Sequence, residues 1–168
     1  MLRTRPPIID IEASGFGVHG YPIEVGVVMN DGSKYCALVL PSPHWTHWDE
    51  EAQKVHRISR DILETYGKPI GEIARTLNEM LRERTAFSDA WGVDKTWLDK
   101  LFYAGGIQPE FSLSALELIL SEPQMEIWHP TKDELLREIG DARRHRASFD
   151  AYLIQETYYR TRKAVSDK

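Results

Sequence analysis

The chain has 168 residues, of which 42% are hydrophobic and 28% are charged, with a single cysteine and a formal net charge of −5. This length and composition predict one folded domain and exclude a disordered chain and a membrane-spanning one, since no apolar run approaches the roughly 20 residues that cross a bilayer. The negative charge argues against passive binding to long nucleic acid, but it is compatible with an enzyme whose acidic groups hold cations.

Two further features bear on where the protein works. Residues 1–7 contain two arginines but no apolar core of the kind that a secretion signal needs. The lone cysteine, Cys36, excludes an internal disulfide and fits a reducing compartment. We therefore expect a cytoplasmic protein that makes no contact with a membrane.

The N-terminal part of the chain predicts three strands. Residues 8–12 are a β-branched and nearly unbroken apolar run, which is typical of a strand buried on both faces. Residues 23–29 form a second, valine-rich strand, and residues 30–33 contain the Asp-Gly pair that favours a hairpin turn. The chain then returns as a third strand over residues 34–40. We expect these first three strands to be antiparallel.

Helical patterns dominate the rest of the chain and alternate with short strands. Asp49 and Ser59 are typical N-caps, and apolar residues recur at helical spacing further along. We expect strands at 85–88 and 110–113, and helices near 49–55, from residue 59, and over 71–84, 94–103, 114–120, 131–139 and 147–162. This order of elements predicts an α/β fold with a mixed sheet.

The first strand ends in two carboxylates, Asp10 and Glu12, which are spaced two residues apart. Side chains on a strand alternate between faces, so these two point the same way. Like charges side by side at the end of a buried strand repel each other and lose hydration, and such a pair is stabilised when a cation lies between them. Hard divalent cations prefer oxygen ligands of this kind. The pair therefore predicts a metal site.

Three later residues carry compatible chemistry at the edges of predicted elements. Asp94 lies at the start of a helix, and Asp150 lies in the last helix, five residues after His145. With the first two acids they provide four carboxylates and an imidazole. Such a set can hold two divalent ions about 3.5–4 Å apart, which stabilise the attacking and leaving oxygens of a phosphoryl displacement. The imidazole can accept the proton of the attacking water.

Three segments of the chain resemble the exonuclease motifs of the DEDDh 3′–5′ exonucleases, the group of the proofreading subunits, ribonuclease T and oligoribonuclease. The segments are Asp10-Ile11-Glu12-Ala13-Ser14-Gly15-Phe16, Asp94-Lys95-Thr96-Trp97-Leu98 and His145-Arg146-Ala147-Ser148-Phe149-Asp150-Ala151. They occur in the family's order and extend over nearly the whole chain. The resemblance implies a single exonuclease domain over residues 1–168 with a ribonuclease H-like fold, in which helices flank a five-stranded mixed sheet.

The resemblance also implies roles for individual residues. Two Mg²⁺ or Mn²⁺ ions would be held by Asp10, Glu12, Asp94 and Asp150. His145 would be the general base, and the turn formed by Ala13, Ser14, Gly15 and Phe16 would hold the 3′-terminal nucleotide, with Phe16 against the end base. The implied reaction releases nucleoside 5′-monophosphates from the 3′ end of single-stranded or short DNA or RNA. Several members of the family are homodimers, so the resemblance leaves a homodimer open.

The second motif departs from the family pattern. Family members commonly carry a His-Asn pair a few residues before the aspartate, whereas this chain has Asp89-Ala90. Asp89 ends a candidate strand and is therefore an alternative third carboxylate. Asp94 is favoured because Trp97 and Leu98 follow it at the family's spacing.

Other interpretations stay open. The rival functions are a non-catalytic nucleic-acid or protein-binding module on the same fold, and a nuclease that cleaves internally. Basic residues crowd the last quarter of the chain, as either a solvated face or a phosphate-binding surface: Arg137, Arg143, Arg144, Arg146, Arg160, Arg162 and Lys163. The spacing of His44, His47, His56 and Cys36 fits no standard zinc site. Nothing in the sequence decides the role of Glu24.

Overall fold

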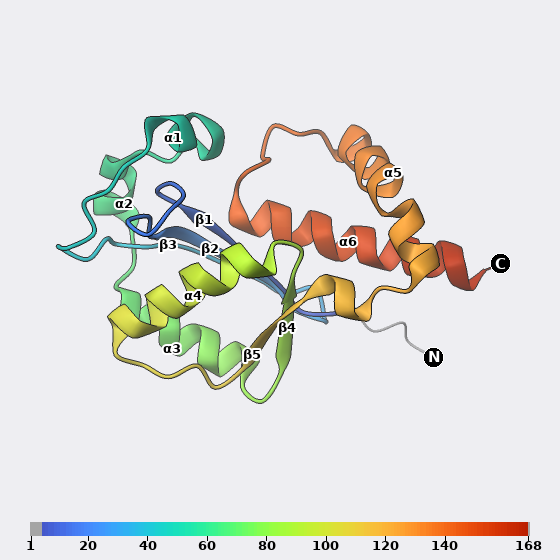
Figure 1. The fold of residues 1–168 in the computed structure, drawn as a ribbon, viewed down its shortest axis with the longest axis horizontal. Helices are drawn as coiled ribbons and strands as arrows, with labels where there is room; N and C mark the ends of the chain where they lie inside the picture. Colours follow the sequence, from blue (N-terminus) through green and yellow to red (C-terminus); the bar gives the residue numbers. More distant parts are fainter. Residues whose placement is uncertain (1–4, 168) are drawn as a thin grey trace.

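A computed structural model describes residues 5–167, which form a five-stranded mixed sheet flanked by helices (Figure 1). The strands are β1 (Ile8–Ala13), β2 (Pro22–Val28), β3 (Lys34–Leu38), β4 (Thr85–Ser88) and β5 (Ser112–Ala115), in the spatial order β3-β2-β1-β4-β5. β2 runs antiparallel to β1 and β3, whereas β4 runs parallel to β1 and β5. The predicted α/β class with a mixed sheet is confirmed. The strand order is not the chain order, because β1 is central and pairs with both β2 and β4.

Helices connect the strands and cover both faces of the sheet. They are α1 (Glu50–His56), α2 (Arg60–Tyr66), α3 (Ile70–Leu81), α4 (Trp91–Gly105), α5 (Glu122–Ile139) and α6 (Ala147–Ser166), with a 3₁₀ turn at Leu116–Ile119. α1 and α2 begin at the predicted caps, where the side chains of Asp49 and Ser59 accept backbone N–H groups of the first turn. In Figure 1, α3 and α4 lie on one side of the sheet and α5 and α6 on the other.

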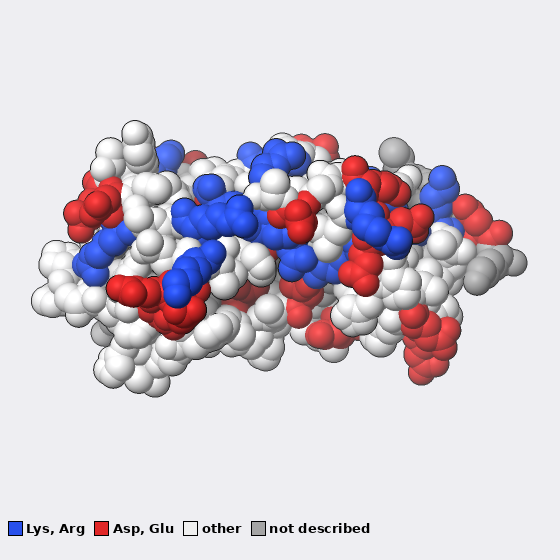
Figure 2. Space-filling view, turned by 90° about the horizontal axis from the view of Figure 1, so that it is seen from above, with Lys and Arg blue, Asp and Glu red and all other residues white. Residues whose placement is uncertain are grey.

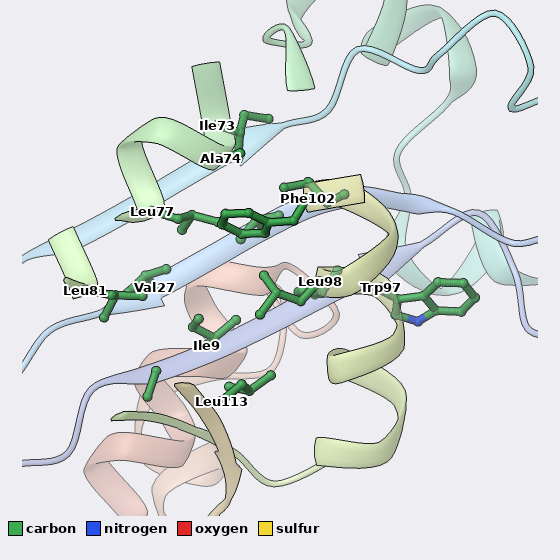
Figure 3. Close-up of a cluster of buried hydrophobic side chains, with 14 of the residues drawn as sticks. Ile9, Val27, Ile73, Ala74, Leu77, Leu81, Trp97, Leu98, Phe102 and Leu113 are labelled. Atoms are coloured by element: carbon green, nitrogen blue, oxygen red, sulfur yellow. The ribbon is translucent and has the colours of Figure 1, made fainter. Parts of the chain in front are cut away.

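The two faces of the sheet bury separate apolar cores. The larger core lies between the sheet and α3 and α4 (Figure 3), and it includes Ile9, Val27, Ile73, Leu77, Leu81, Leu98 and Phe102. On the opposite face, Ile8 and Val28 pack against Ala151 and Ile154 of α6. Because side chains alternate along a strand, Asp10 and Glu12 share the face of Ile8. The two carboxylates therefore point toward the α6 side of the sheet.

The region between β4 and α6 differs most from the sequence-based expectation. α5 begins at Glu122 rather than near residue 131, and it continues through Pro130. A proline inside a helix removes one backbone hydrogen bond, but the buried Trp128 packs this helix against α6 and keeps it continuous. Residues 114–120, expected as a helix, form the end of β5 and the 3₁₀ turn Leu116–Ile119. The prediction of a helix there was therefore wrong.

Other boundaries moved by a few residues. α4 begins at Trp91 rather than at residue 94, so that Asp94 lies within its first turn, and α3 ends at Leu81 rather than at 84. The expectation about residues 1–7 concerns a segment whose first four residues lie outside the described part. Between residues 5 and 167, no helix combines the length and the apolar character that crossing a bilayer would require.

Candidate active site

The carboxylates of β1 lie beside β2 residues that let a helix approach the sheet closely. Across the antiparallel ladder, Asp10 pairs with Gly26 and Glu12 pairs with Glu24. Paired residues share a face, so all four positions lie on the α6 side. A Cβ atom at Gly26 would overlap the backbone of Ala147. The first turn of α6 therefore rests directly on β2, next to the two carboxylates.

This close approach brings the third motif to the end of β1. One ligand atom from each of Glu12, His145 and Asp150 lies within 4.8 Å of the other two. His145 occupies the turn before α6 with a φ of 61°, and its backbone N–H donates to Asp150 Oδ2 at 3.0 Å. The structure thus combines a carboxylate of the first motif with the imidazole and the carboxylate of the third.

Asp10 lies deeper on the same face of β1. Its Oδ2 atom is buried and accepts no hydrogen bond from the described residues. Burial raises the pKa of Asp10 well above its ordinary value, and the neighbouring carboxylates of Asp94, Glu12 and Asp150 raise it further. A buried carboxyl oxygen without a donor, surrounded by other acids, is the kind of group that a bound cation would stabilise.

Asp94 reaches β1 where β4 has diverged from it. β1 and β4 pair where Ile8 lies opposite Phe87. Further along β1, the Ile11 N–H donates a hydrogen bond to Asp94 Oδ1 at 3.2 Å. The Ser88 hydroxyl donates to the second carboxylate oxygen of Asp94. Burial raises the pKa of Asp94 to about 7, although these two donors oppose the increase. Asp94 is therefore fixed to the strand that carries the first motif.

The alternative residue, Asp89, has a different partner. Its Oδ2 atom lies 3.0 Å from Lys132 Nζ of α5, and both side chains are partly exposed. Its negative charge still raises the pKa of Asp94 and of Asp10. Among the described contacts, Asp94 is thus hydrogen-bonded to β1, whereas Asp89 is paired with Lys132 of α5.

The acidic groups of the site resist ionising together. Burial raises the pKa of Glu12 to about 7, with Asp150 and Glu24 adding to the increase. Burial likewise raises the pKa of Asp150, which Arg144 opposes from a distance of 3.4 Å between Nε and Oδ1. Among residues 5–167, no lysine or arginine lies within ion-pair distance of Asp10, Glu12 or Asp94. The oxygen-rich donor set with one imidazole fits a divalent cation.

Glu24 holds the start of α6 in place, a role that the sequence left undecided. The Glu24 side chain is fully buried, and its carboxylate accepts hydrogen bonds from Arg146 Nη2 at 2.6 Å and from the Ala147 backbone N–H at 2.8 Å. The Cys36 thiol donates to it at 3.4 Å. Glu24 therefore ties β2 to the segment between His145 and Asp150. The sequence signal for this structural role is the position of Glu24, a charged residue within an otherwise apolar strand.

The turn after the first motif exposes only part of the predicted nucleotide-binding segment. Phe16 is 81% exposed, whereas Ser14 is fully buried. The backbone N–H of Ser14 donates to Tyr21 O at 2.9 Å, and its carbonyl accepts the Asp49 N–H at 2.9 Å. Gly15, which has a φ of 151°, packs so closely that a Cβ would lie 2.7 Å from the Cβ of Asp49. Ser14 and Gly15 thus shape the turn, Ala13 ends β1, and Phe16 projects from it.

Two tryptophans before α2, Trp45 and Trp48, pack against a small core. The Trp45 ring stacks on the buried Tyr21 at 5.3 Å between centroids, and Trp48 meets the buried His56 edge-on at 6.1 Å. His56 Nδ1 accepts the Ile58 N–H at 3.1 Å, and burial lowers the pKa of His56. Trp45 and Trp48 therefore cover this core rather than form an exposed stacking platform.

Comparison with solved structures finds the same fold in exonuclease I. The complex of Escherichia coli exonuclease I with a dA16 oligonucleotide superposes with a TM-score of 0.69 at 12% identity, over 90% of this chain and 39% of that chain. The zinc-bound form of the E. coli enzyme with single-stranded DNA gives a TM-score of 0.71 at 12% identity, over 95% and 40% of the two chains. A product-bound exonuclease I gives 0.65 at 11% identity.

These matches show a shared fold alone, because the identities are low. The chain spans about two fifths of the length of the E. coli exonuclease I structures that it matches. No protein-family model matches the sequence. No curated protein matches it either.

Proposed function

We propose that this protein is a cytoplasmic 3′–5′ exonuclease of the DEDDh type on a ribonuclease H-like fold. It would use two Mg²⁺ or Mn²⁺ ions to release nucleoside 5′-monophosphates from the 3′ end of single-stranded or short nucleic acid. The observation that carries this proposal is the convergence of Glu12, His145 and Asp150 within 4.8 Å. The fold of exonuclease I, which binds oligonucleotides in its complexes, supports nucleic acid as the partner.

Each residue of the site has a chemical role in this reaction. The ions would be held by Asp10, Glu12, Asp94 and Asp150. When bound, divalent ions supply Lewis acidity to the phosphodiester and make a water molecule more acidic. His145 accepts a proton from the water as its oxygen bonds to phosphorus, and the 3′ oxygen leaves with the electron pair of the broken P–O bond. Phe16 would stack on the terminal base, which suits a substrate read without sequence preference.

The variant Asp10→Asn tests the proposal most directly. It removes one negative charge at nearly constant volume, so the fold should survive while metal-dependent catalysis is lost. We expect hydrolysis of a 5′-labelled single-stranded oligonucleotide in Mg²⁺ or Mn²⁺ to fall by about a thousandfold or more. Asp61→Asn, on the exposed surface of α2, is the matched control and should cleave like the unmodified protein. Full activity of Asp10→Asn would refute the assignment.

The products separate the proposed function from its rivals. A ladder that shortens from the 3′ end, with nucleoside 5′-monophosphates released, is the expected pattern on both DNA and RNA panels. Cleavage of a circular single strand would instead identify a nuclease that acts internally. Intact substrates together with no Mn²⁺ binding by calorimetry would identify a non-catalytic binding module.

A further inference from the structure

A cleft beside His145 is lined by arginines from three separate parts of the chain. It has a volume of about 610 Å³, and its walls include Arg57 at the end of α1, Arg137 in the last turn of α5, and Arg144 in the turn before α6. Figure 2 views the molecule from the side of α1 and α5 and shows lysine and arginine side chains gathered across the middle of this face. This local positive charge contrasts with the net charge of −5 for the whole chain.

Two of the three cleft arginines, Arg57 and Arg137, have no carboxylate partner, whereas Arg144 is paired with Asp150. Outside the cleft, ion pairs to carboxylates hold about half of the described arginines, which are Arg5, Arg60, Arg82, Arg146 and Arg160. Between residues 5 and 167, no carboxylate lies within ion-pair distance of Arg57 or Arg137. Arg137 Nε donates to the backbone carbonyl of Asp133 at 3.3 Å, and Asp141 is the acidic residue of the lining. Two guanidinium groups are thus left available to an anionic ligand.

The other walls of the cleft suit a ligand that is only partly charged. Val55, which is 48% exposed, and Leu136 contribute apolar surface beside the arginines. Guanidinium groups bind phosphate oxygens through paired donors, while apolar side chains accept sugars and base faces. His145 lines the cleft and also belongs to the candidate active site. A ligand in the cleft would therefore continue into that site.

We infer that this cleft binds the phosphodiester backbone of the single strand on the 5′ side of the scissile phosphate, with Arg57 and Arg137 as the phosphate-binding residues. The inference rests on the proposed function: an enzyme that acts at a 3′ end must let the rest of the strand leave the site in the 5′ direction. We expect the cleft to favour substrates longer than a dinucleotide, because a longer strand places more phosphates beside the arginines.

The combined variant Arg57→Gln and Arg137→Gln tests this inference. Glutamine keeps most of the side-chain length and removes the charge, so catalysis at the carboxylates should persist. For a twelve-nucleotide single strand we expect KM to rise about tenfold and kcat to stay within about twofold, while the kinetics on a dinucleotide stay unchanged. Each lost phosphate contact should reduce the slope of log KM against log salt concentration by about 0.7.

The control removes two arginines that lie outside the cleft. Arg75→Gln on α3 combined with Arg162→Gln near the end of α6 changes the net charge equally and should leave both substrates unaffected. An unchanged KM for the long strand in the cleft variant would overturn the inference. An equal loss on both substrates would also overturn it, because the arginines would then act at the scissile phosphate or on the fold.

A binding measurement keeps this inference separate from the proposed function. If the unmodified protein hydrolyses nothing, fluorescence anisotropy of a 5′-labelled twelve-nucleotide strand still reports the cleft. A Kd about tenfold weaker in the cleft variant alone would support the cleft while the proposed catalysis fails. Equal binding by the cleft variant and the control, or no binding to any form, would contradict the cleft itself.

Discussion

His145 is positioned by its backbone as much as by its side chain. A non-glycine residue at a φ of 61° costs on the order of 1 kcal/mol relative to ordinary helical or extended backbone. The hydrogen bond from its N–H to Asp150 Oδ2 at 3.0 Å offsets part of this cost and fixes the imidazole beside the carboxylates. The strain is thus located at the residue to which we assign the proton transfer.

If His145 is the proton acceptor, catalysis and metal binding should respond differently to its removal. We expect His145→Ala to lower kcat by about 10²- to 10⁴-fold, because the attacking water loses its base. The carboxylates remain, so Mn²⁺ affinity measured by calorimetry should change by only a few fold. His129→Ala, on the exposed surface of α5, should change neither quantity. A parallel loss of Mn²⁺ affinity would make His145 a metal ligand instead.

At the scale of elements, the site depends on how closely α6 docks onto β2. Gly26 leaves room for the first turn of the helix, and the Glu24 carboxylate accepts the Ala147 N–H at 2.8 Å. Both residues occupy the strand beside Asp10 and Glu12, so the same contact sets the position of the helix and of His145 and Asp150, the residues for which we propose catalytic roles. The pairing of Asp10 with Gly26 and of Glu12 with Glu24 depends on the register of β1 and β2, which the sequence alone does not specify.

A single methyl group at this contact should disturb the site. In Gly26→Ala the new Cβ overlaps the Ala147 backbone, so α6 must move away from β2. We expect a loss of about 1–3 kcal/mol in the free energy of unfolding and a Mn²⁺ affinity at least about tenfold weaker. Urea denaturation and calorimetry measure the two effects. Gly92→Ala, at a position with open space around its Cβ, is the control. Unchanged Mn²⁺ affinity in a destabilised Gly26→Ala protein would show that the docking does not position the ligands.

At the scale of the whole molecule, local patterns were predictable and long-range partners were not. The strands over β1 to β3 follow from apolar runs and a hairpin turn, and the spacing of Asp10 and Glu12 fixes their common face. The sequence predicted that α5 begins near residue 131, because a proline such as Pro130 usually marks a helix boundary. In the structure the helix begins at Glu122 and continues through Pro130, with Trp128 packed against α6. The contribution of Arg57 to the cleft depends on tertiary folding, since α1 is remote from α5 in the sequence.

The raised pKa values of the site predict how overall stability depends on pH. Glu12 and Asp94 have ordinary values of 4.5 and 3.8, and burial raises the pKa of each to about 7. Between these values the folded protein binds more protons than the unfolded chain. Their stabilising contribution is therefore complete below about pH 4 and is lost as the pH rises through about 7. In EDTA we expect Tm to be about 5 °C higher at pH 5.5 than at pH 8.

A bound divalent ion should reverse this trend, because it stabilises the ionised carboxylates. Mn²⁺ at pH 8 should raise Tm above its value in EDTA, and the increase should be much smaller in Asp10→Asn. Differential scanning calorimetry at the two pH values, with and without Mn²⁺, provides the comparison. A Tm that rises with pH in EDTA would contradict the raised pKa values.

The candidate site takes residues from both ends of the chain, and this has a consequence for the order of events during folding. The first two acids come from the earliest strand, whereas the imidazole and the last acid arrive with the final helix. A partly folded intermediate in which the sheet has formed but that helix is still detached lacks His145 and Asp150, two of the five candidate residues. If the protein has the hydrolytic activity that we propose, this activity should be among the last properties that a refolding molecule regains.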